Sequence, residues 1–381
     1  MSSEAVELDS WSVGGIAPSS VVSPTDVPSL AEALVDAAGR GDAIGVCGGR
    51  SKIQQGAAPD ALDVMIRTVG LDRIVEHAAG DLVVTVQSGV RLADLQVSLG
   101  PAGQWLALDP PEAGATIGGV VAAGSSGPCR LRYGTPRDLL VGITVVLADG
   151  TVAKSGGKVV KNVAGYDLGK LFTGSFGTLG VIAECTFRLH PLPPVRRVVT
   201  AKTDTPAAAA ARVHSTGATP SAMEWNGQTL TVVVESFEAA AEIQAADIAR
   251  AIDGEISDAL PDDFGQLPAG QVGVKITHRL GALTEVIADI GRLVPNARLR
   301  AHVGSGVVHA GTDDGGLGWL DVLRAAIGKH DGQVVVVTAP DELKKDVDVW
   351  GPARGIEIMR RIKDQFDPEH RMSPGRFVGG L

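Results

Sequence analysis

Aromatic residues are scarce in this chain, at 4% of its 381 residues. Proteins that bind single-stranded nucleic acid use aromatic side chains as stacking platforms, so this scarcity disfavours that class. The formal net charge is −10, and no run of Lys and Arg supplies the clustered basic surface that a nucleic acid requires. We therefore expect no nucleic acid among the partners.

Cysteine and long apolar segments are also rare. The three cysteines, Cys47, Cys129 and Cys185, are far apart and form no C-x-x-C motif, which excludes a zinc or iron–sulfur site built from this chain alone. Reduced thiols in the cytoplasm are the default for such a pattern. No run of about 18 apolar residues occurs, and residues 1–7 lack the features of a signal peptide. We expect no direct membrane insertion, although a partner complex could bring the protein to a membrane.

Glycine, in contrast, is abundant, at 49 of 381 residues. It is densest in three turns, at 115–119, 124–128 and 174–180. Glycine lets the backbone approach a bulky ligand closely, and its N–H groups can face phosphate or flavin oxygens. These turns therefore predict a large cofactor that lies along the backbone.

Two common nucleotide-binding motifs are missing. No G-x-G-x-x-G opens a helix after a strand, and no Walker motif G-x-x-x-x-G-K-[ST] occurs, which disfavours nicotinamide and ATP. The segment Gly48–Lys52 instead follows a short apolar strand. Its consecutive N–H groups could form an anion-binding nest, but the same segment could be an ordinary turn.

Hydrophobic periodicity predicts alternating helices and strands along the chain. The expected helices are 24–41, capped by Asp26 and ended by Gly39, then 91–99, 117–123, 206–216, 239–253, 284–293 and 355–366. The expected strands are 43–47, 64–66, 74–76, 82–87, 105–108, 142–147, 151–154, 181–188, 198–202, 230–236, 273–277, 297–301 and 334–337. The proline-rich segment 190–194 predicts a domain boundary. We expect a lead-in at 1–20, a first domain at 21–192, an α+β domain at 193–345 and a C-terminal segment at 346–381.

The order of these motifs resembles a known family. Gly48–Lys52, Thr116–Gly119, Tyr133-Gly134 with Arg137-Asp138, and Gly177–Val181 together resemble the PCMH-type FAD-binding domain of the vanillyl-alcohol-oxidase family. The C-terminal Phe366-Asp-Pro and Ser373–Arg376 resemble the closing signature of its D-lactate/glycolate dehydrogenase branch. The run Gly157–Leu168 is similar to the FAD-binding (E) subunits of glycolate oxidases. The resemblance implies an α+β fold, with a two-subdomain FAD-binding domain, a ferredoxin-like α+β cap and a C-terminal segment that packs back on the FAD domain.

The resemblance also implies which residues hold noncovalent FAD. The pyrophosphate would meet Gly48, Gly49, Arg50, Ser51 and Lys52. The flavin and ribityl chain would run past Pro110, Thr116, Gly118, Gly119, Gly124 and Ser126, and the adenine end would meet Gly177, Thr178, Gly180 and Val181. Asp138 would be a polar anchor, and Asn162 would face either the cofactor or the subdomain packing. Covalent attachment is not indicated, because the 48–52 turn has no histidine.

His302 and His309 are the candidate catalytic residues. Their spacing resembles the element with which catalytic relatives bind a divalent metal and the substrate carboxylate. Two imidazoles are too few for a metal, and the Glu-His pair that completes the site in those relatives is absent from 339–348, where only Asp341 or Glu342 could substitute. We therefore predict no metal, and the two histidines are either catalytic or structural. Lys275 and Arg279 are further candidates for contact with the substrate.

The resemblance implies oxidation of a 2-hydroxy acid, such as glycolate or D-lactate, to a 2-oxo acid. In that interpretation the chain is the FAD-binding subunit of a glycolate oxidase complex, with a second, catalytic FAD-binding subunit and an iron–sulfur subunit that receives the electrons. One alternative is a self-sufficient FAD-dependent 2-hydroxy-acid dehydrogenase. The other is a scaffold subunit that binds FAD without catalysis.

Overall fold

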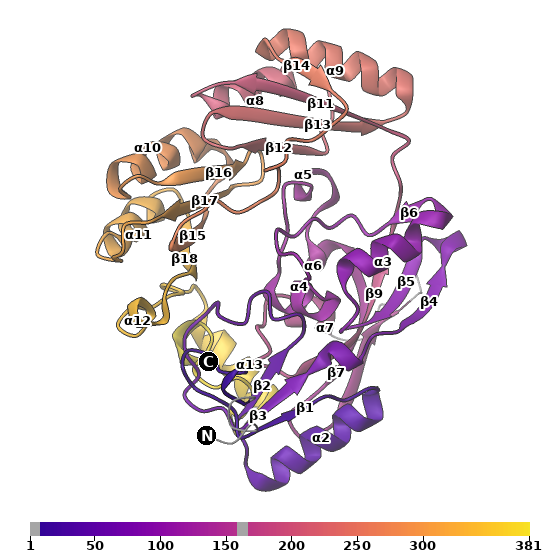
Figure 1. The fold of residues 1–381 in the computed structure, drawn as a ribbon, viewed down its shortest axis with the longest axis vertical. Coiled ribbons are helices and arrows are strands. Elements are labelled where there is room, and N and C mark those ends of the chain that lie inside the picture. Colours follow the sequence, from indigo (N-terminus) through magenta and orange to yellow (C-terminus); the bar gives the residue numbers. More distant parts are fainter. Residues whose placement is uncertain (1–7, 158–166) are drawn as a thin grey trace.

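The computed structural model describes residues 8–157 and 167–381, which form two lobes (Figure 1). The lower lobe contains the first part of the chain and the C-terminal segment, and the upper lobe contains the sheet that begins at β11. Strands and helices are mixed in both lobes. The predicted α+β fold class is therefore confirmed. No helix of the described residues is long and apolar enough to cross a membrane.

A small parallel sheet in the lower lobe carries the first glycine turn. Its strands lie in the order β1 (Ser20–Val22), β3 (Val64–Arg67) and β2 (Ile44–Cys47). Helix α2 (Val27–Arg40) begins at Asp26, whose carboxylate accepts a hydrogen bond of 2.8 Å from the Ser29 N–H. The helix ends at Gly41 instead of the predicted Gly39, because Gly41 adopts a left-handed conformation (φ 73°) and its N–H bonds the last carbonyls.

A second, antiparallel sheet forms the other half of this lobe. Its order is β4 (Ile74–Ala78), β5 (Val83–Gln87), β9 (Val181–Arg188), β7 (Leu140–Val146) and β8 (Val152–Gly156). Its buried side chains pack against α3 (Leu92–Leu99), α4 (Ile117–Ala123), α6 (Pro136–Leu139) and α7 (Leu168–Phe172). The predicted strand 105–108 shortens to β6 (Gln104–Trp105), which pairs with β10 (His190–Pro191). Helix α5 (Arg130–Tyr133) contacts the upper lobe.

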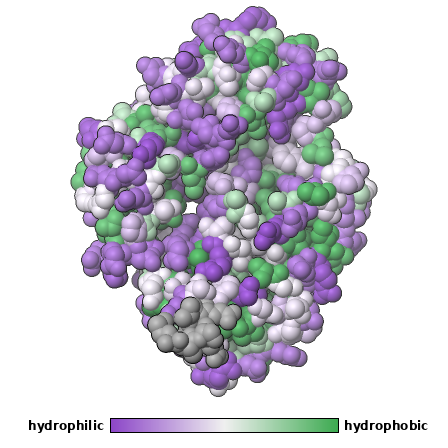
Figure 2. Space-filling model, in the orientation of Figure 1, coloured by the Kyte–Doolittle hydropathy of each residue, from purple (hydrophilic) through white to green (hydrophobic). Residues whose placement is uncertain are grey.

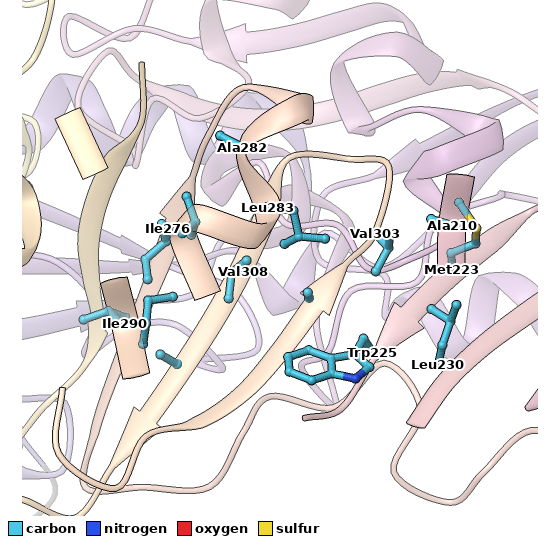
Figure 3. Close-up of a cluster of buried hydrophobic side chains, with 14 of the residues drawn as sticks. Ala210, Met223, Trp225, Leu230, Ile276, Ala282, Leu283, Ile290, Val303 and Val308 are labelled. Atoms are coloured by element: carbon cyan, nitrogen blue, oxygen red, sulfur yellow. The ribbon is translucent and has the colours of Figure 1, made fainter. Parts of the chain in front are cut away.

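The upper lobe is one eight-stranded antiparallel sheet with helices on one face. The strand order is β14 (Glu255–Ser257), β11 (Val195–Lys202), β13 (Thr229–Ser236), β12 (Ala222–Trp225), β16 (Arg298–His302), β17 (Val307–Thr312), β15 (Val272–Thr277) and β18 (Gln333–Thr338). The helices are α8 (Pro206–Ser215), α9 (Glu238–Ile252), α10 (Leu283–Leu293) and α11 (Leu320–Gly328). Figure 3 shows Ile276, Val308 and Trp225 on this covered face, in the apolar core of the lobe. The opposite face is free to carry polar side chains.

The C-terminal segment returns to the lower lobe after α12 (Asp341–Lys344). Helix α13 (Ile356–Phe366) buries Lys363, whose ammonium donates to the Thr178 carbonyl (2.8 Å) and pairs with Asp367 (2.7 Å). The chain then runs beside β2, where the Ile44 N–H donates to the Arg371 carbonyl. This contact places the end of the chain next to the first glycine turn.

The surface is mixed in character. On the face drawn in Figure 2, hydrophilic residues dominate the upper lobe and hydrophobic residues occur in small groups. No large apolar patch stands out on this face, so the site must be sought in the cavities.

Candidate functional site

The first glycine turn opens into a cavity that is open to solvent. Five segments meet there: the loop after β2, the residue that follows β3, the start of α4, the loop before β9, and the segment near the C-terminus. The predicted FAD-binding residues that line it are Gly48, Gly49, Arg50, Ser51, Lys52, Thr116, Gly118, Gly119, Gly177 and Gly180.

Close backbone packing explains two of these glycines. A Cβ on Gly48 would lie 2.1 Å from the Thr116 hydroxyl, and one on Gly49 would lie 2.3 Å from the Gly114 carbonyl. The Gly49 N–H also donates to the Thr116 hydroxyl at 3.4 Å. The turn therefore lies directly against the start of α4, and no larger residue fits at either position.

Unpaired backbone donors show that this turn suits an anionic group. Within residues 8–157 and 167–381, the N–H groups of Arg50, Ser51 and Lys52 donate no hydrogen bond to the protein. Arg50 has a positive φ of 62°, a conformation that helps successive N–H groups to converge on one anion. The residues present thus fit the pyrophosphate of a dinucleotide, with Gly119 and Gly177 on the walls of the same cavity.

Several predicted residues lie outside this lining and have local roles. Asp138 caps α6 through Thr135, whose N–H donates to its carboxylate at 2.8 Å; hydrogen bonds from Thr135 lower the pKa of Asp138. Gly124 ends α4 in a left-handed conformation. Ser126 accepts a hydrogen bond from Arg130. Pro110, Thr178 and Val181 are also absent from the lining. Asn162 lies outside the described residues.

The sequence reasoning missed four polar or aromatic residues of the lining: Thr68, Phe176, Ser373 and Arg376. The Arg376 guanidinium donates to the Ile53 carbonyl at 2.8 Å and so fixes the far end of the glycine loop. Ser373 donates to the Gly177 carbonyl at 3.4 Å. Ser373 and Arg376 both belong to the C-terminal Ser-Pro-Gly-Arg motif, which the sequence analysis uses only as a family signature and not as part of the site.

The face of the upper sheet opposite its helices holds both candidate histidines. Arg300 is the cross-strand partner of His309, and Glu224 is the partner of His302; such partners point to the same face. The two imidazole rings are 5.3 Å apart, and their side chains are buried. In the described part of the chain, neither Nδ1 atom has a hydrogen-bond partner. His302 Nε2 lies 3.8 Å from a Glu224 oxygen.

Burial controls the charge of this face. It lowers the pKa of His302 to about 3, with Arg130 as the next cause, and it lowers the pKa of His309 well below its usual range. Burial also lowers the pKa of Lys275 to about 8, assisted by Arg130 and Lys52. Lys52 lines the cavity described above, so the histidine face and that cavity are neighbours. Both rings are neutral at pH 7.

Nothing in the described ranges completes a metal site. Across residues 8–157 and 167–381, no group of three or more His, Cys, Asp or Glu side chains is arranged to hold a metal ion. Asp341, considered as a substitute ligand, pairs with Lys344 at 2.6 Å, and Glu342 pairs with Lys345 at 3.0 Å. Arg279 follows the end of β15 and lines none of the cavities that contain the residues above.

Parts of this chain are similar in sequence to known proteins. The chain is 32% identical over 231 residues to the glycolate oxidase subunit GlcD of Bacillus subtilis, covering 58% of this chain and 48% of the relative. It is 42% identical over 122 residues to the glycolate oxidase subunit GlcE of Escherichia coli, covering 32% of this chain and 35% of the relative. The chain therefore matches less than half the length of each of these relatives.

The fold of the chain resembles a solved structure, and its first domain matches a family model. A solved alkyldihydroxyacetonephosphate synthase superposes with a TM-score of 0.69 over 93% of this chain and 75% of its own, at 16% identity; this likeness shows the fold alone. Residues 18–156 match the model of the FAD binding domain family, and this range contains the glycine turn and most of the cavity lining. Residues 18–156 are thus similar to the FAD binding domain family, and FAD is the cofactor of this chain.

Proposed function

We propose that the chain is an FAD-binding subunit of a glycolate-oxidase-type complex that oxidises 2-hydroxy acids to 2-oxo acids. The observation that carries the proposal is a sheet face with the buried His302 and His309 and the partly buried Lys275. This face lies beside the cavity of the 48–52 turn, which we call the FAD cavity. Similarity to two glycolate oxidase subunits supports the substrate class. A second FAD-binding subunit and an iron–sulfur subunit would complete the complex. Its proposed location is the cytoplasm, with contact to a membrane only through partner subunits.

The residues of this face have complementary roles in such a reaction. Bound FAD supplies the two-electron acceptor. Lys275 and Arg130 are the cations placed to hold the substrate carboxylate. His302 and His309 are neutral, so each ring offers a lone pair to the proton of the substrate hydroxyl. An arriving carboxylate raises the pKa of both rings by adding a nearby negative charge, and it thereby favours this proton transfer.

Anaerobic mixing of the FAD-loaded chain with glycolate or D-lactate tests the proposal. We expect the flavin absorption to bleach when the partner subunits are present. Bleaching of the chain alone would support the self-sufficient enzyme, an alternative favoured by the presence of His302, His309 and Lys275 on one chain. No bleaching with or without partners would support the scaffold subunit and would exclude the proposed function.

His302→Ala should slow this bleaching about a hundredfold, the lower end of the effect of a proton-accepting group. The control is His214→Ala, since His214 is an exposed histidine of α8 on the other side of the sheet. The rate of flavin reduction under anaerobic stopped flow is the measurement. Equal rates in both variants and the unmodified chain would remove His302 from the mechanism.

Lys275 should make substrate binding depend on pH. Its pKa is about 8, and only its ammonium form attracts a carboxylate. We expect KM to be flat below pH 8 and to rise about tenfold per pH unit above it, as the lysine loses its proton. Lys275→Arg should remove this rise and keep binding, whereas Lys202→Met, at an exposed strand position, should leave the profile unchanged. A KM that does not change between pH 7 and pH 10 would contradict the role of Lys275.

A further inference from the structure

A second cavity, also open to solvent, lies next to the FAD cavity. The two cavities share Ala123 and Phe176 in their walls. The second cavity is bounded by the edge of the upper sheet on one side and by the C-terminal segment on the other. A ligand held beside the flavin can therefore extend directly into this space.

On the sheet face above the cavity, the chemical type of the side chains changes from one strand to the next. Val335 on the edge strand β18 is the cross-strand partner of Lys275, and Lys275 is the partner of His309. Cross-strand partners share a face, as do Gln333 and Val337, which lie two residues on either side of Val335. A row of side chains thus runs from apolar at the edge to cationic and then to imidazole.

Lys275 provides an anchor for an anionic group at the inner end of this row. It lines the second cavity, and its ammonium makes no hydrogen bond or ion pair with any residue of the described ranges. The charged groups that influence it are Arg130 and Lys52, which are positive, and Glu112, which is negative. Glu112 is already paired with Lys52 at 2.7 Å. Among the described residues no carboxylate is left to pair with Lys275, so a ligand carboxylate can take that place.

Apolar and aromatic side chains form the outer wall. The ring centroids of Phe176 and Trp350 are 4.8 Å apart, and those of Trp350 and Phe377 are 5.0 Å apart. Phe176 has a positive φ of 56°, which is rare for a bulky residue and indicates local strain. Its backbone N–H is fixed by the Ala122 carbonyl at 3.0 Å. The strained backbone places this ring at the boundary of the two cavities.

Glycolate and lactate offer this wall little apolar surface. Glycolate has no carbon substituent at its hydroxyl-bearing carbon, and lactate has a methyl group. Val335 is the cross-strand neighbour of Lys275, so a larger substituent on a ligand whose carboxylate lies at Lys275 can cover more of the wall formed by Val335, Val337 and Phe377. Each methylene that leaves water for such a wall improves binding by about fourfold.

We propose that the substrate is a 2-hydroxy acid with a large apolar substituent, which lies along Val335, Val337 and Phe377 while its carboxylate meets Lys275. This inference rests on the proposed 2-hydroxy-acid oxidation. It concerns the substrate alone and adds no chemical step to that reaction.

A substrate series tests the inference. The FAD-loaded full chain, with its partner subunits, is compared on glycolate, D-lactate, D-2-hydroxyhexanoate and D-phenyllactate. We expect kcat/KM to rise along the series and to be at least about tenfold higher for phenyllactate than for lactate, as the burial of a phenyl group requires. Equal or lower values for phenyllactate, with glycolate or lactate still reacting, would overturn the inference and leave the proposed function standing. Failure of every 2-hydroxy acid would overturn the proposed function itself.

A conservative variant tests whether Val335 causes the preference for a large apolar substituent. Val335→Thr keeps the branched shape of an edge-strand residue but puts a hydroxyl on the wall, and we expect it to lower kcat/KM for phenyllactate about tenfold while the value for lactate changes less than about twofold. Val152→Thr is the matched control, because Val152 lies on the edge strand β8 of the other sheet and is 43% exposed. If Val335→Thr affects both substrates equally, or if the partner subunits abolish the preference by covering the cavity, the inference is wrong.

Discussion

Gly119→Leu should weaken the binding of FAD by at least about a thousandfold, or about 4 kcal/mol. Gly119 lies in α4, and a Cβ placed there meets only the Thr116 hydroxyl, at 3.2 Å. The rest of a leucine side chain would extend into the cavity, where we propose that the cofactor lies. Leucine also has a higher helix propensity than glycine, so the FAD-free protein should unfold at the same or a slightly higher temperature.

A second helical glycine, away from the cavity, provides the control for Gly119→Leu. Gly39 lies within α2, is exposed, and has no atom within 4 Å of an added Cβ. Gly39→Leu should therefore leave the affinity for FAD unchanged. The measurements are titration of the FAD-free protein with FAD and thermal unfolding without FAD. If Gly119→Leu bound FAD as tightly as the unmodified chain, the cofactor would have to lie elsewhere.

Lys363→Met should lower the free energy of unfolding by about 3–5 kcal/mol, the usual effect of removing one partner from a buried ion pair. The Lys363 ammonium is 2.7 Å from Asp367 and donates to the carbonyls of Thr178 and Met372, each at 2.8 Å. Methionine leaves the Asp367 carboxylate buried without its cation. It also frees the Thr178 carbonyl, in the loop whose Phe176 and Gly177 line the FAD cavity. FAD affinity should fall together with stability.

An exposed lysine in an ion pair is the control for this change. Lys345 pairs with Glu342 at 3.0 Å, with side chains 61% and 83% exposed, and such pairs contribute less than about 1 kcal/mol. Urea unfolding of the FAD-free proteins should show a large fall in the midpoint for Lys363→Met and almost none for Lys345→Met. Similar midpoints for both variants would show that the C-terminal segment does not depend on the buried pair.

Local sequence signals made the lower lobe, which we call the FAD lobe, largely predictable. The capping aspartate at 26, the apolar strand before the 48–52 turn and the glycine turns at 116–119 and 177–180 each act within a few residues, and the structure brings these turns to one cavity. The main errors there are also local. The helix ends at Gly41 and not at Gly39, since both are glycines and only the conformation distinguishes them. Asp138 is used as a helix cap because Thr135 precedes it at capping distance.

Long-range contacts set the rest of the site, and a single sequence does not show them. Arg376 reaches the carbonyl of Ile53, more than three hundred positions earlier in the chain. Glu224 lies beside His302 only because β12 pairs with β16. Neither strand β12 nor strand β17 was predicted, since their residues are buried on both faces and show no alternation. The second cavity depends on the packing of the sheet edge against the C-terminal segment.

The stoichiometry and release of the flavin test the central claim, that one FAD is held noncovalently in the cavity of the FAD lobe. The purified chain is saturated with FAD, freed of excess, and denatured in acid, and the flavin is measured in the supernatant and in the precipitate. We expect one FAD per chain, all of it in the supernatant, because no histidine lies in the 48–52 turn. Protein that cannot be loaded with FAD, or flavin that stays with the precipitate, would contradict the account.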